Sequence, residues 1–111
     1  MRPASCKAKG RKLQDAIREA ILERFPDLDP ADVKTAIMGE SGMDIRLSGA
    51  AKKKFPFAVE AKNQEKLSVW SAWEQACANA SGLLPAIIFK RNRSETLVAL
   101  RLSDLLGLLG D

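Results

Sequence analysis

Residues 55–90 read FPFAVEAKNQEKLSVWSAWEQACANASGLLPAIIFK, and this stretch decides the fold class. Apolar and polar side chains alternate from Phe55 to Lys62, which predicts a half-buried strand. Ser68 is a good N-cap, so we predict a helix over Val69 to Ala80. The run from Pro85 to Lys90 is almost wholly apolar, as in a central strand that is buried on both faces. A strand, a helix and another strand in this order predict an α/β or α+β domain with a mixed sheet.

The flanking segments extend this pattern in both directions. Apolar residues from Lys12 to Phe25 recur at helical spacing, and a last short helix follows Ser103, which we take as its cap. Three further strands are predicted at Asp32–Met38, Met43–Leu47 and Thr96–Leu102. An exposed connection is predicted at Ser48–Lys54. The predicted order is helix, three strands, helix, two strands, helix (αβββαββα). We predict a basic tail over residues 1–10 and one domain over residues 11–111.

The helix expected after Ser68 carries both tryptophans of the chain. Trp70, Trp73, Cys77 and Ala80 fall on one apolar side at helical spacing. We therefore predict that this side packs against the sheet. Platforms for base stacking are the alternative for the two indole rings.

Composition removes several classes of chemistry. The 111 residues are 46% hydrophobic, which is enough for a core without a disulfide or structural metal, and they include no histidine. Ser-His-Asp and Cys-His relays and His-ligated zinc sites are therefore excluded. The two cysteines form no CxxC pattern, and the basic segment from Met1 to Gly10 does not resemble a secretory signal. No apolar run is long enough to span a membrane, so we expect a cytoplasmic protein.

Lysine and arginine gather in three clusters, and the formal net charge is +4. Solvated loops and a disordered tail would account for any one of the clusters. The three together favour contact with a phosphate backbone, so we predict a nucleic acid partner. The clusters consist of Arg2, Lys7, Lys9, Arg11 and Lys12; of Lys52, Lys53 and Lys54; and of Lys90, Arg91 and Arg93.

Three charged residues on two predicted strands are candidates for chemistry. Glu60 and Lys62 lie two apart on one strand, so their side chains leave the same face. Asp44 lies on the preceding strand and converges with Glu60 if the two strands form a hairpin. Two carboxylates, together with the carbonyl of Ala61, are oxygen ligands of the kind that Mg²⁺ or Mn²⁺ prefers. A surface ion pair on a polar strand face is the more ordinary explanation of the same residues.

A longer pattern carries a resemblance to a known family. The runs SGMDIRLS, FPFAVEAKNQEKLSVWSAWEQACANA and PAIIFKRNRS are similar to small phage-encoded nucleases of the PD-(D/E)XK superfamily, often described as Holliday-junction-resolvase-like. The resemblance covers about Lys12 to Leu102 and implies a restriction-endonuclease-like fold. Met43 stands where the motif has proline.

The resemblance also implies roles for individual residues. It makes Asp44 and Glu60 the metal ligands and Lys62 the catalytic lysine. Gln75 matches the position of a glutamine beside the active site in many members, and a solvated helix residue is the alternative.

Two further positions follow from the same resemblance. Resolvase-type members often add a glutamate from the first helix, where this chain has Gln14, with Glu19 as another candidate. An amide brings no charge, so the number of metal ions stays open. Asn63, next after Lys62, is a candidate contact to phosphate, with strand-end polarity as the alternative.

These implications lead to one expected function and one alternative. We expect a Mg²⁺-dependent (or Mn²⁺-dependent) endodeoxyribonuclease that hydrolyses phosphodiesters of branched or duplex DNA. Junction resolution takes two symmetric cuts, so a homodimer is expected, in the host cytoplasm if the chain is phage-encoded. The alternative is a non-catalytic basic module that only binds nucleic acid.

Overall fold

The computed structural model describes residues 6–37 and 42–110, with only the backbone of Cys6. Its element order confirms the predicted αβββαββα arrangement and adds one 3-10 turn and one short helix. Arg2 and Met38, which belong to a predicted cluster and a predicted strand, lie outside the described residues. The helices are α1 (Cys6–Arg24), α2 (Gly49–Lys54), α3 (Val69–Ala78) and α4 (Leu102–Leu109), and the 3-10 turn is η1 (Pro30–Asp32). The strands are β1 (Val33–Thr35), β2 (Ile45–Leu47), β3 (Phe57–Asn63), β4 (Leu84–Lys90) and β5 (Leu97–Leu100).

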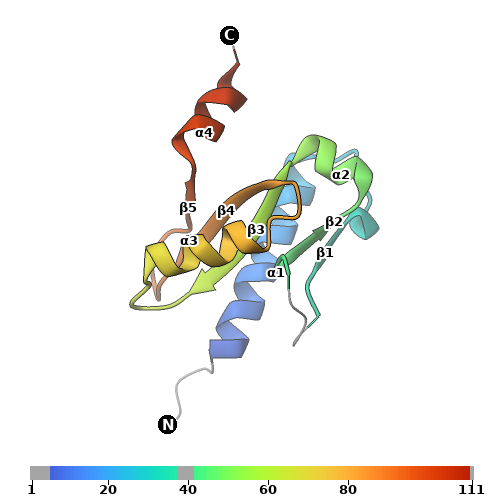
Figure 1. Cartoon of the computed structure of the whole chain (residues 1–111). Helices are drawn as coiled ribbons and strands as arrows, with labels where there is room; N and C mark the ends of the chain where they lie inside the picture. Colours follow the sequence, from blue (N-terminus) through green and yellow to red (C-terminus); the bar gives the residue numbers. More distant parts are fainter. Residues whose placement is uncertain (1–5, 38–41, 111) are drawn as a thin grey trace.

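The strands form a three-stranded mixed sheet and a two-stranded antiparallel pair (Figure 1). β4 lies between β3 and β5, parallel to β3 and antiparallel to β5. β1 and β2 make up the pair. The amide of Asp44, just before β2, donates to the carbonyl of Val59 in β3 at 2.9 Å. This hydrogen bond joins the pair to the larger sheet, so the start of β2 lies beside the middle of β3.

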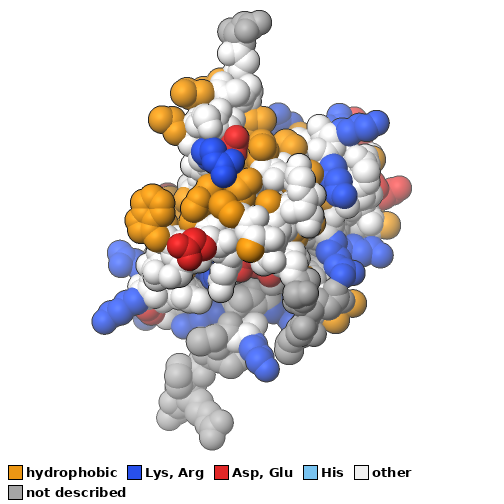
Figure 2. Space-filling model, in the orientation of Figure 1, with side chains coloured by type: hydrophobic (Ala, Val, Ile, Leu, Met, Phe, Trp, Pro, Cys, Tyr) orange, Lys and Arg blue, Asp and Glu red, His pale blue; other side chains and the backbone are white. Residues whose placement is uncertain are grey.

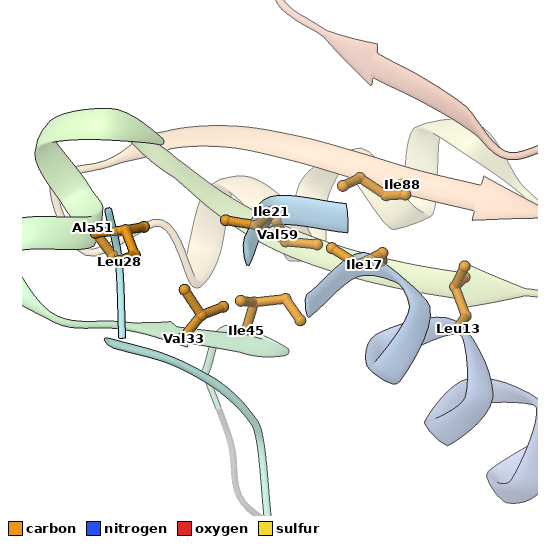
Figure 3. Packing of buried hydrophobic residues seen from close by; sticks show 9 residues of the cluster. All are labelled: Leu13, Ile17, Ile21, Leu28, Val33, Ile45, Ala51, Val59 and Ile88. Carbon is orange, nitrogen blue, oxygen red and sulfur yellow. The ribbon is translucent and has the colours of Figure 1, made fainter. Parts of the chain in front are cut away.

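α1 covers one face of these strands. Its buried residues Leu13, Ile17 and Ile21 recur every four positions, which places them on one side of the helix. They pack with Ile45 of β2 and Val59 of β3, as Figure 3 shows. This cluster also contains Leu28, Val33, Ala51 and Ile88. The apolar pattern predicted for the first helix therefore corresponds to the main hydrophobic core.

α3 covers the other face, and its fully buried residues there are small. Ala72 and Ala76 are buried against Ile87 of β4. The predicted apolar side is confirmed for Trp73, which packs against this cluster, but it is wrong for Trp70, which is 79% exposed, and for Cys77, which is exposed. Two alanines four positions apart let the helix backbone approach the sheet closely. Alanine contributes little to an apolar pattern, so the larger residues suggested a side that is rotated away from the true one.

The segment Ser48–Lys54, predicted as an exposed connection, is largely the helix α2. The Ser48 hydroxyl accepts from the amide of Ala51 at 3.1 Å and donates to Asp32 Oδ1 at 2.7 Å. That hydrogen bond, together with one from the Asp29 amide, lowers the pKa of the Asp32 carboxyl. Ala51 is fully buried, so the capped turn anchors the chain between β2 and β3. The sequence GAAKKK shows no apolar helical pattern, because a single alanine, Ala51, is the only buried residue of this helix.

Two helix boundaries also differ from those expected. α4 begins at Leu102 with Arg101 as its N-cap, so Ser103 lies inside the helix and is not the cap. α1 begins at Cys6 and takes in residues 6–10 of the predicted tail. Among the described residues the structure contains no helix with the length and apolarity of a membrane span.

Candidate active site

Asp44 is held between β1 and β3 by its backbone and its side chain. Its amide donates to the Val59 carbonyl and its carbonyl accepts from the Ala36 amide, each at 2.9 Å. Its side-chain Oδ2 accepts from the Ala61 amide at 2.6 Å. The next residue, Ile45, is fully buried in the core. The carboxylate therefore has a fixed place at the edge of β3, with Oδ1 left for another partner.

Glu60 is the one charged residue that is buried in the described part of the chain, with 8% of its surface exposed. Val59 and Ala61 belong to the α1 face, so strand alternation directs Glu60 and Lys62 to the α3 face. Glu60 Oε2 lies 3.5 Å from Lys62 Nζ. Glu60 Oε1 is buried and accepts no hydrogen bond from any residue that the structure describes. A buried carboxylate oxygen without a donor is costly, and such an oxygen suits a cation.

The charge state of Asp44 reflects the same crowding. Burial raises the pKa of its carboxyl above the ordinary value, the hydrogen bond from the Ala61 amide opposes that rise, and the negative charge of Glu60 adds to it. Lys62 acts in the opposite direction as the smallest of the four causes. Glu60 and Lys62 thus both act on the Asp44 carboxyl, although β2 and β3 do not form a hairpin: β2 pairs with β1, and β3 belongs to the other sheet.

A divalent cation fits this donor set. Asp44 Oδ1 and Glu60 Oε1 are the two carboxylate oxygens without a described partner. An extended residue directs its N–H and C=O to the same edge of the strand, so the Ala61 carbonyl faces the Asp44 edge, as its amide does. The described residues contain no group of three or more His, Cys, Asp or Glu that could hold a metal. Two carboxylates, one carbonyl and water are nevertheless a usual shell for Mg²⁺, which keeps several waters.

The backbone amide of Ala61 is a functional group that sequence reasoning missed. It fixes the Asp44 carboxylate through the 2.6 Å hydrogen bond. No sequence signal could have found it, because every residue except proline carries the same donor.

Gln75 and Gln14 lie on opposite sides of the sheet. Gln75 is exposed on α3, about 80° around the helix from the buried side. Trp73 lies on the opposite flank of that side, and its ring contacts the Arg101 guanidinium just after β5. The position of Gln75 faces the β3 side, where Glu60 and Lys62 lie. Gln14 is half-buried on α1, which packs on the other face.

Glu19 is further removed from the candidate site than Gln14. It is exposed, about 200° around α1 from the side that packs on the sheet. None of the described contacts joins Gln14, Glu19 or Gln75 to Asp44, Glu60 or Lys62.

Two of the basic clusters lie at the end of β3 that carries Lys62. Asn63 Nδ2 donates to the carbonyl of Lys9 at 3.4 Å, which ties α1 to this end. Lys90 lies opposite Asn63 in the β3–β4 register, and its carbonyl accepts from the Gln64 amide at 3.1 Å. The residues predicted to contact DNA that belong to these two clusters, together with Asn63, are Lys7, Lys9, Arg11, Lys12, Lys90, Arg91 and Arg93.

The third cluster, Lys52–Lys54, closes α2 just before β3 begins. β3 has seven residues, so this cluster stands about 20 Å from the Lys62 end of the strand.

Comparison with known proteins adds one family to this geometry. Residues 23–109 match the model of the family described as "Phage putative PDDEXK endonuclease". This match covers well over half of the chain. The chain belongs to this PDDEXK endonuclease family. No curated protein and no solved structure matches it.

The family match contains most of the candidate site. Asp44, Glu60, Lys62 and Gln75 lie within the matched residues, as do the elements from η1 to α4. Gln14 lies outside them, in the part of α1 that precedes residue 23. The resemblance to PD-(D/E)XK phage nucleases is thereby confirmed, and the mixed α/β architecture is compatible with a small nuclease of this kind.

We expect Asp44→Asn to raise the midpoint temperature of thermal unfolding of the metal-free protein by about 2–5 °C at about pH 8. The folded state raises the pKa of Asp44, so wild-type stability declines as the pH rises through that value. The amide stays neutral and its oxygen keeps the acceptor for Ala61. The gain should vanish below about pH 3, where Asp44 is protonated in both states. Thermal melts across this pH range test it.

The matched control for this measurement is Asp27→Asn, an exposed position in the loop after α1 that should change little. Mg²⁺ or Mn²⁺ should raise the melting temperature of the wild type and of D27N but not of D44N. A D44N protein that is less stable than the wild type at both ends of the pH range would contradict the prediction.

Proposed function

We propose that this chain is a metal-dependent DNA endonuclease that hydrolyses phosphodiester bonds at a centre made of Asp44, Glu60 and Lys62. The observation that supports it most is the buried Glu60, whose Oε1 has no hydrogen-bond donor while its Oε2 meets Lys62. Structural ion pairs seldom leave a buried oxygen unsatisfied. In a chain of a PDDEXK endonuclease family, a cation site explains that oxygen directly.

In the proposal, each residue of the centre has a separate task. Asp44 and Glu60, with the Ala61 carbonyl, would hold Mg²⁺ or Mn²⁺. A bound ion of this kind lowers the pKa of its water and offsets the charge that develops on a phosphodiester. Lys62 has three N–H donors, and the contact with Glu60 uses one of them. The other two are available to orient a water molecule or a phosphate oxygen.

The surroundings of the centre support a DNA substrate. Lys90, Arg91 and Arg93 follow β4, and parallel strands end at the same edge, so this turn lies beside the Lys62 end of β3. The first turns of α1 approach the same edge through Lys9 and Asn63. We propose that these groups bind the phosphate backbone of DNA, so that the DNA passes over the centre. Gln75 would contribute from α3, and Gln14 would act only from the far face.

We further propose selectivity for branched DNA, a homodimer and action in the host cytoplasm, in keeping with the resemblance to resolvase-like phage nucleases. Two symmetric cuts at a junction need two centres, which a two-fold dimer supplies.

The proposal is tested by incubating the protein with labelled four-way junction, hairpin and linear duplex DNA. We expect nicks that appear with Mg²⁺ or Mn²⁺ and stop when EDTA is added, with the junction cut fastest. Equal cutting of all three substrates would overturn the junction selectivity but not the nuclease. Salt-sensitive binding without product under every metal tested would overturn the nuclease and favour a module that only binds nucleic acid.

A further inference from the structure

Exposed apolar side chains gather at one end of the molecule. The described residues include ten large exposed hydrophobic side chains, and nine of them lie on the first turn of α3, on β5 or on α4. Figure 2 shows hydrophobic side chains on α4 and on the surface next to it. Val98 lies on the α1 face of β5, where it lines a separate pocket with residues of α1. We call the other eight the C-terminal apolar surface: Val69, Trp70, Leu97, Leu102, Leu105, Leu106, Leu108 and Leu109. So strong a concentration is typical of a contact surface.

α4 needs a partner to be stable. The helix has eight residues, none of them buried, and it extends away from the sheet (Figure 1). Helices of this length are marginal in water unless they pack against something. Four leucines (Leu102, Leu105, Leu106 and Leu109) follow the i, i+3, i+4, i+7 spacing and form one apolar stripe. Ser103 and Gly107 lie off that stripe.

A groove that can receive such a stripe lies at the base of the same helix. It runs between α3 and β5, has a volume of about 330 Å³, and is lined mainly by Val69, Trp70, Trp73, Ala99 and Leu102. Leu102, the first residue of α4, is one of its lining residues. From there α4 extends away from the sheet (Figure 1). The helix therefore leaves its own groove unfilled.

We infer that α4 of each chain docks in the α3–β5 groove of a second copy, giving a reciprocal two-fold dimer. One chain presents both the helix and the groove, so a two-fold axis satisfies two grooves with two helices. This inference does not rest on the proposed nuclease activity, although it names the surface through which the proposed homodimer would form.

The available area and the local charge both fit a second copy. The eight side chains of the C-terminal apolar surface expose on the order of 100 Å² each, which matches the roughly 800 Å² per partner of a stable interface. α4 contains one charged residue, Asp104, whose Oδ2 lies 3.3 Å from Arg101 Nη1. The Arg101 guanidinium also lies over the Trp73 ring, 5.5 Å from its centroid. The local charges cancel, so two chains of net charge +4 can approach at this surface.

The test is the mass of the full chain in solution, measured by light scattering after size-exclusion chromatography. At about 20 µM the wild type should have twice the 12.1 kDa of one chain. Leu106→Glu on the stripe and Trp70→Glu in the groove should each raise the dimer dissociation constant by about 100-fold or more. Ser103→Glu adds the same charge on the other side of α4 and should leave the dimer intact.

Folding and activity give independent readouts. Both Leu106 and Trp70 are exposed, so the circular dichroism of the monomeric variants should match that of the wild type. Tryptophan emission of the wild type should shift to the blue as its concentration rises, because Trp70 enters the interface. A monomeric wild type at about 20 µM, or dimers that survive both variants, would overturn the inference. A dimer without DNA cleavage would contradict the proposed function alone.

Discussion

Glu60→Gln and Lys62→Met should each reduce Mg²⁺-dependent DNA cleavage by about 10³-fold while DNA binding changes by less than about threefold. Glu60→Gln keeps the shape of the side chain but removes the negative charge whose Oε1 has no other partner. Lys62→Met keeps the apolar stem and removes the donors that meet Glu60. Single-turnover cleavage of a labelled junction and gel-shift titration in Ca²⁺ or EDTA measure the two effects separately.

The matched controls make the same two types of substitution at exposed positions away from the proposed centre. Glu23→Gln on α1 and Lys66→Met after β3 are both exposed, and both should cleave like the wild type. Undiminished cleavage by either E60Q or K62M would contradict the assignment of the centre to these residues. A loss that is equally large in a control variant would point to charge in general instead of these positions.

The proposed centre and the stability of the fold oppose each other. Asp44 and Glu60 are brought together in a partly buried place, and burial and the charge of Glu60 raise the pKa of Asp44. In the metal-free protein this arrangement lowers the stability of the fold, whereas a bound cation would offset that loss. The stabilisation expected for Asp44→Asn and the activity loss expected for Glu60→Gln are therefore two consequences of one geometry.

The sequence predicted the fold best where side-chain size and period agree. Leu13, Ile17 and Ile21 define a clear helical side, and the apolar run of β4 correctly predicted a central strand. Prediction failed where small residues decide the packing. Ala51 anchors α2, while Ala72 and Ala76 turn α3 so that Trp70 faces solvent. Single-sequence patterns give alanine little weight, since it is common in exposed helices as well.

The candidate site was predictable only in part, because it depends on which strands are neighbours. The spacing of Glu60 and Lys62 placed them on one face, and the structure then brought Asp44 to the same edge of β3. A one-dimensional pattern cannot say on which face of a sheet a helix packs. The structure places α1, with Gln14, opposite Glu60, so the place of Gln14 in the proposed centre stays a prediction.

Replacement of the three charges after β4 should weaken DNA binding by about 10- to 100-fold at about 0.1 M salt. The variant combines Lys90→Gln, Arg91→Gln and Arg93→Asn, the last because Arg93 has a φ of 61° that asparagine tolerates. Each lost phosphate contact lowers the slope of log K against log salt by about one. Titrations at several salt concentrations therefore count the contacts, and cleavage at saturating DNA should change little.

The matched comparison replaces Lys52, Lys53 and Lys54 with glutamine, which removes the same charge from the opposite end of β3. These lysines also stand in the last turn of α2, where cations favour the negative end of the helix dipole, so they have a structural reason to be there. If DNA passes the Lys62 end of β3, this variant should lose less affinity and less salt dependence than the first. An equal loss in both would mean that the bound DNA extends along the whole strand, about 20 Å, and reaches α2 as well.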